Sequence, residues 1–82
     1  MTGFKAFARD TRLYITGGFP ETAAYKVDLY TTGGQSLAQF NINAEAGYSS
    51  IACSLTRPLP AIFLIRVSGK HGYAASMLSV SQ

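Results

Sequence analysis

The sequence predicts an all-β protein, a sandwich or barrel built from seven short strands. Apolar and polar residues alternate in several segments, and glycine, proline and asparagine separate these segments at intervals of about 8 to 12 residues. No segment sustains the periodicity of an amphipathic helix. The 82 residues are expected to form a single module, 1–82, and 48% hydrophobic against 13% charged residues allow it to fold around a thin core.

The two strands expected nearest the N-terminus have the weakest patterns. Residues 4–8 alternate over a short stretch, and residues 12–16 ("RLYIT") place two aliphatic side chains on one face. Gly17 and Gly18 follow directly. Because glycine weakens a strand interior, this pair is expected to end the second strand.

A hairpin is expected next. Residues 23–30 ("AAYKVDLY") show the clearest alternation in the chain. Thr31 to Gln35 ("TTGGQ") contains paired glycines, which adopt positive φ without steric cost and so predict a tight turn. The chain is then expected to return as a strand over residues 36–42.

The second half of the chain predicts three more strands. Residues 48–55 carry apolar residues at every second position, and two prolines separate them from residues 61–69 ("AIFLIRVSG"). That segment is apolar on both faces, which predicts a central strand covered on both sides. A glycine-rich turn then leads to a last strand over residues 73–80.

Residues able to perform catalysis are few and scattered. His71, the only histidine, lies in a turn between two glycines, where a solvated side chain is expected. Cys53, the only cysteine, occupies an inward position, which favours a small buried residue over a nucleophile paired with His71. The four acids fall in different strands or loops. No catalytic, cofactor-binding or metal-binding residue is assigned, and the chain is not expected to be an enzyme.

The distribution of charged and apolar residues limits the classes of partner that the chain is expected to bind. Seven Lys and Arg against four Asp and Glu give a net charge of +3, but the basic residues are scattered along the sequence, which disfavours nucleic acid as a partner. No stretch approaches the roughly 20 apolar residues that a spanning helix needs, so no membrane span is expected.

Three tyrosines suggest one function. Tyr30, Tyr48 and Tyr73 lie at strand ends or beside turns, where partly exposed rings are expected. Aromatic rings on a flat sheet bind sugars by stacking on their apolar faces. These residues therefore favour a carbohydrate-binding module of a polysaccharide-degrading enzyme. The alternative interpretation is that they border a small core with their hydroxyls in water.

Four segments also resemble a known family. Residues 26–40 ("KVDLYTTGGQSLAQF") resemble the strand, turn and strand of the C-terminal sorting domains of the type IX secretion system. Residues 54–69 ("SLTRPLPAIFLIRVSG") are similar to that family's next block, with Ile62 where the family has glycine. Residues 12–18 ("RLYITGG") and the closing "ASMLSVSQ" resemble its early and terminal strands.

The resemblance implies a seven-stranded antiparallel immunoglobulin-like β-sandwich, carried as the C-terminal module of a larger secreted protein of Bacteroidota type. It also implies a non-catalytic secretion sorting or cell-surface attachment signal, recognised by secretion machinery or surface-attachment proteins, on a chain that is secreted or displayed at the cell surface. Recognition is expected in the closing hairpin, at Arg66, Gly69, Lys70, Tyr73, Leu78 and Val80.

The last strand, residues 73–80, is expected to form an exposed edge. Such an edge is a template for strand addition by a receptor. The weak N-terminal strands are expected to leave an edge through which two copies can pair. A structural or assembly subunit is the remaining alternative.

Overall fold

The computed structural model describes residues 5–70 and 74–81. They form seven strands, which are β1 (Lys5–Arg9), β2 (Arg12–Phe19), β3 (Ala23–Tyr30), β4 (Ser36–Ala44), β5 (Gly47–Ser54), β6 (Ile62–Ser68) and β7 (Ala74–Ser81). The described part of the chain contains no helix with the length and apolar character needed to cross a membrane.

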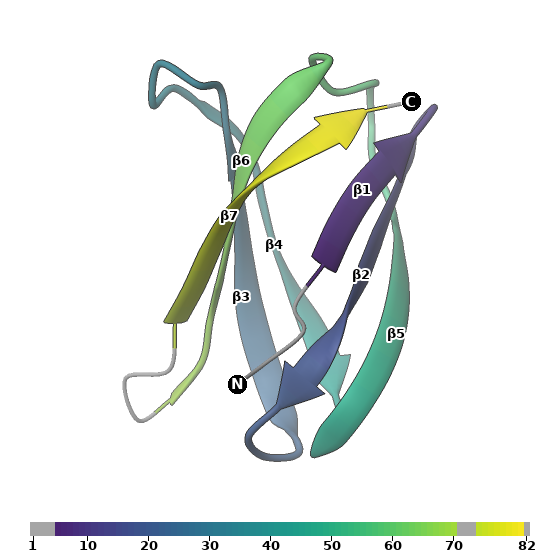
Figure 1. The fold of residues 1–82 in the computed structure, drawn as a ribbon, viewed down its shortest axis with the longest axis vertical. Helices are drawn as coiled ribbons and strands as arrows, with labels where there is room; N and C mark the ends of the chain where they lie inside the picture. Colours follow the sequence, from purple (N-terminus) through teal and green to yellow (C-terminus); the bar gives the residue numbers. More distant parts are fainter. Residues whose placement is uncertain (1–4, 71–73, 82) are drawn as a thin grey trace.

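All seven strands join one mixed sheet in the order β4-β3-β6-β7-β1-β2-β5. The sheet curls until it is nearly closed into a barrel, with β4 and β5 as its two edges (Figure 1). The prediction of an all-β protein with seven strands is therefore confirmed. The expected fully antiparallel pairing does not hold, because β1 and β7 pair in parallel. These strands come from opposite ends of the chain, so no tight turn between them fixes an antiparallel direction.

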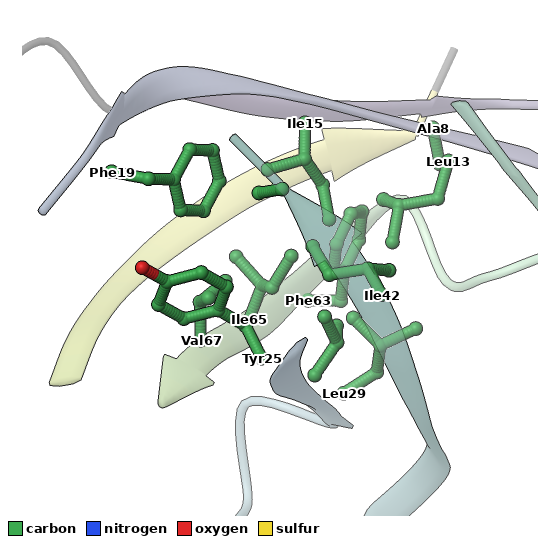
Figure 2. Close-up of a cluster of buried hydrophobic side chains, with 12 residues drawn as sticks. Ala8, Leu13, Ile15, Phe19, Tyr25, Leu29, Ile42, Phe63, Ile65 and Val67 are labelled. Carbon is green, nitrogen blue, oxygen red and sulfur yellow. The ribbon is translucent and has the colours of Figure 1, made fainter. Parts of the chain in front are cut away.

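The core occupies the inside of this curled sheet (Figure 2). Inward side chains from β2, β3 and β6 contribute most of the large buried residues, which are Leu13, Ile15, Tyr25, Val27, Leu29, Phe63, Ile65 and Val67. Burying one large aliphatic or aromatic side chain stabilises a fold by about 1.5–3 kcal/mol. This single layer of side chains therefore holds the sheet in its curled form.

Tyr25 links the core to two loops. Its ring packs against Phe19 with centroids 4.9 Å apart, and its hydroxyl donates a hydrogen bond to the Glu21 carbonyl over 2.6 Å. Gly69 lies directly against the same ring, because a Cβ at this position would be 2.7 Å from two of the Tyr25 ring carbons. Gly69 is thus required for packing at the end of β6.

The β3–β4 hairpin forms as the sequence predicts. The Thr31 amide donates to the Gln35 carbonyl over 2.8 Å, and the Gly34 amide donates to the Thr31 carbonyl over 2.9 Å. Gly34 has a φ of 93°, the left-handed conformation that favours glycine. The turn residues therefore determine the register of this hairpin.

Two expectations are wrong, one about where β2 ends and one about which strand forms an edge of the sheet. β2 does not stop at Gly17 and Gly18 but continues to Phe19, because β5 pairs with it along its whole length. β7 is not an edge either, since it lies between β6 and β1 (Figure 1). The edge strands available for pairing are β4 and β5.

Candidate functional site

The two faces of β6 differ sharply in burial. Its inner residues Phe63, Ile65 and Val67 are at most 1% exposed, whereas Ile62 on the outer face is 48% exposed and Leu64 is half-buried. The prediction that β6 is covered on both sides is wrong for the outer face. All seven strands belong to one sheet, so no second layer lies over that face in the described residues.

Neighbouring strands extend this outer apolar surface. The registers place Ile62 beside Val80, Val80 beside Phe7 and Phe7 beside Tyr14, which forms a row across β6, β7, β1 and β2. A second, shorter row pairs Leu64 with Leu78. We call this set the apolar strip, and its members are Phe7, Tyr14, Ile62, Leu64, Leu78 and Val80.

Several members of the apolar strip are strongly exposed. Leu78 is 59% exposed, Val80 is 50% exposed and Phe7 is 39% exposed. The rings of Phe7 and Tyr14 stack with centroids 4.9 Å apart, which holds both against the sheet. Contiguous exposed apolar side chains of this kind are typical of interaction sites, whereas isolated ones are ordinary.

The charged residues on the strands of the apolar strip and on β5 are all cationic, whereas the adjoining β3 places Asp28 in register with Arg66. Strands β6, β7, β1, β2 and β5 contain four cationic residues and no Asp or Glu. The cations are Lys5, Arg9, Arg12 and Arg66, and all four are exposed. Arg9 pairs in register with Arg12, and Arg66 lies two residues from Leu64 on the same face. The nearest acid along the chain, Asp10, is in the β1–β2 turn.

The predicted recognition residues fall partly on this surface. Arg66, Leu78 and Val80 share the outer face of β6 and β7, so the structure brings them together. Gly69 packs on Tyr25, and Lys70 is exposed just after β6. Tyr73 lies outside the described residues, as does His71.

Four members of the apolar strip were not predicted as site residues. Ile62 and Leu64 were detectable from the sequence, because a strand apolar on both faces is either buried twice or presents a binding face. Phe7 and Tyr14 carry a weaker signal, since each is an aromatic residue whose strand neighbours point to the core. Only the β1–β7 pairing brings these aromatic residues next to Val80.

Of the tyrosines predicted to bind sugar, the two within the described residues do not share a surface. Tyr30 is half-buried at the end of β3, beside the β3–β4 turn, whereas Tyr48 is 73% exposed at the start of β5, beside the β4–β5 turn. β4 runs from one turn to the other, so Tyr30 and Tyr48 lie beside opposite ends of it. They do not form one stacking platform.

Cys53 lies on the inner face of β5 and is partly buried against the core. Burial raises the pKa of its thiol above the usual range, which keeps the sulfur protonated and poorly nucleophilic near neutral pH. Within residues 5–70 and 74–81, no three His, Cys, Asp or Glu side chains lie close enough to hold a metal ion.

The apolar strip and its cations have the anatomy of a protein-binding surface, with apolar side chains at the centre and polar or charged ones around them. The arrangement can bury apolar area and attract an anionic partner. Comparison with protein-family models, curated proteins and solved structures finds no match for this chain.

Proposed function

We propose that this chain is a non-catalytic attachment module, which serves as a secretion sorting or cell-surface attachment signal by binding an acidic protein surface through the apolar strip. The observation that carries this proposal is the exposure of Leu78, Val80 and Ile62 side by side on β6 and β7. Burial of such anchors at the centre of an interface supplies most of its binding energy.

The charge of the same face supports the choice of partner. Four cations and no acid on these strands attract a surface rich in Asp and Glu, and they repel a second copy of the same face. The proposed binding mode uses the face of the closing strands rather than their edge. It retains the location proposed from the sequence, a secreted or surface-displayed protein.

We also propose that the fold is an immunoglobulin-like β-sandwich whose two sheets are joined by one extra strand pairing. Dividing the sheet at the parallel β1–β7 pairing, which joins only two residue pairs, leaves the groups β4-β3-β6-β7 and β1-β2-β5. Numbered along the chain, these groups match the C′CFG and ABE sheets of immunoglobulin-like domains that lack strand D. The strand order therefore supports the expected family of folds, with one extra pairing that joins the two sheets.

The proposed function is tested by secretion of a fusion protein. The chain is fused to the C-terminus of a secreted reporter enzyme in a bacterium that has a type IX secretion system. The double substitution Leu78→Ser and Val80→Ser is expected to lower reporter activity at the cell surface at least ~10-fold, as loss of two interface anchors predicts. Total reporter protein should stay constant.

Tyr48→Ser provides the matched control, because it removes a more exposed aromatic residue outside the apolar strip. This variant should be displayed like the parent chain. Equal surface display of the parent, the double variant and the control would contradict the proposal.

A further inference from the structure

A groove lies where the curled sheet fails to close, between β4 and the chain that ends β5 and continues beyond it. Two adjoining cavities of about 250 and 330 Å³ occupy it. Both are lined by Leu37, Ala38, Leu55 and Thr56. We call this feature the β4–β5 groove, bounded by residues 36–40 on one side and residues 54–59 on the other.

The walls of the β4–β5 groove are largely apolar. Ala38, Phe40, Leu55 and Leu59 are partly buried and pack against the core. Leu37 is 37% exposed at the groove. Leu29 pairs with Ala38 and Tyr30 pairs with Ser36, so Leu37 is the extra residue of a β-bulge. Bulges redirect side chains, and this one accompanies a leucine that lines both cavities.

The strand beside the groove has a free edge, which the bulge at Leu37 interrupts near its start. β4 pairs only with β3 among the described strands, so its other side presents backbone N–H and C=O groups without a strand partner. Natural edge strands commonly carry charges or proline, which discourage further pairing. The nine residues of β4, "SLAQFNINA", contain neither.

We propose that the β4–β5 groove binds an extended peptide segment of another protein, which pairs with β4 as an added strand. Its backbone bonds to the free side of β4, and its alternate apolar side chains pack on Ala38, Phe40 and Leu55. Arg57 is the only charged residue among those that line the two cavities, so the segment carries a carboxylate next to it.

A second copy of this chain is a less suitable occupant. Residues 54–59 of the same chain bound the groove opposite residues 36–40, so this part of the β4 edge faces its own chain, and the edge of a second folded sheet would have to displace them. The site is separate from the apolar strip, which lies on β6, β7, β1 and β2. The two surfaces can therefore be tested independently.

The test is a titration of the full chain with a short acetylated peptide of alternating valine and threonine that ends in glutamate. NMR amide shifts report the contact. We expect saturable shifts at residues 36–40 and 54–59, with a weak Kd between ~10 μM and ~1 mM, because a short flexible peptide loses conformational entropy on binding. The same peptide N-methylated at alternate residues should not bind, because it cannot complete the ladder.

Charge variants then identify the orientation. A peptide with lysine in place of glutamate should bind at least ~3-fold more weakly to the parent chain, and Arg57→Glu should reverse this preference. Arg9→Glu reverses a charge beside the apolar strip, outside the groove. It should leave the affinities for the glutamate and lysine peptides unchanged. Absence of saturable shifts, shifts confined to the apolar strip, or equal binding of the N-methylated peptide would overturn the proposal.

Discussion

The outer faces of β3–β4 and of β6–β7–β1 cover the same core but differ in chemistry. Opposite Val27 and Leu29, β3 presents Lys26 and Asp28, and β4 continues this polar face with amides. β6 also buries its inner residues, such as Ile65, but its outer face carries the apolar residues Ile62 and Leu64 of the apolar strip. Both halves bury their inner side chains equally well. The core thus does not require apolar residues outside, and this difference is the basis for proposing that the apolar strip binds a partner.

On the polar outer face of β3 and β4, a buried polar side chain has a hydrogen-bond partner on the adjacent strand. Asp28 is 6% exposed, and its Oδ1 accepts a hydrogen bond of 2.7 Å from Gln39 Nε2 on the adjacent strand. Buried polar groups are retained at low cost when such partners exist. The apolar strip has no corresponding cover among the described residues, so its side chains remain in contact with solvent.

The largest expected effect separates the two faces of one strand. Ile65→Ala should lower the free energy of unfolding by about 2–5 kcal/mol, because Ile65 is fully buried in the core. Ile62→Ala on the outer face of the same strand should cost less than ~1 kcal/mol, because its side chain is already half in water. Urea denaturation of both variants measures the difference. Equal losses would mean that the apolar strip belongs to the core.

Gly69→Ala should have the next largest effect, a loss of about 1–3 kcal/mol of unfolding free energy. The new Cβ would meet the Tyr25 ring, which Phe19 and the bond to Glu21 hold in place. Thermal denaturation measures the loss. Gly33→Ala is the matched control, since its Cβ would meet nothing closer than 3.7 Å. An unchanged midpoint for Gly69→Ala would contradict the close packing of Gly69 against the Tyr25 ring.

The smallest stability effect concerns the polar half. Gln39→Ala should cost about 1 kcal/mol, because it leaves the buried Asp28 oxygen without its donor. Asn41→Ala, two residues away on the same exposed face, should cost less than ~0.5 kcal/mol. Chemical denaturation of the pair checks this ranking. If the two variants lose the same stability, the Asp28–Gln39 bond does not explain how the polar half tolerates a buried acid.

Local patterns in the sequence predict the hairpin regions well. The alternation of residues 23–30 and the glycines of the following turn predict β3, its turn and β4, because the β3–β4 ladder joins two strands that only this short turn separates. Gly17 and Gly18 led to a wrong prediction for the end of β2, because a contact distant in sequence decides it. Their place in β2 depends on β5, some thirty residues later, whose ladder overrides the weak strand preference of glycine.

The candidate site was only partly predictable. Leu78, Val80 and Arg66 were expected in the closing hairpin from the family resemblance, whereas Phe7 and Tyr14 lie next to them only through the parallel pairing of the two ends of the chain. The double apolar pattern of residues 62–67 has two physical causes, burial on both sides or an exposed binding face. Sequence periodicity does not distinguish them, because both produce the same pattern.

The central claim is that the apolar strip serves binding rather than folding, and one variant tests it most directly. Ile62, Leu78 and Val80 are all replaced by threonine, which keeps the strand preference, and both the free energy of unfolding and surface display of the reporter fusion are measured. We predict a change in unfolding free energy within ~1 kcal/mol and a fall in display of at least ~10-fold. A loss of ~3 kcal/mol or more, or unchanged display, would contradict the account.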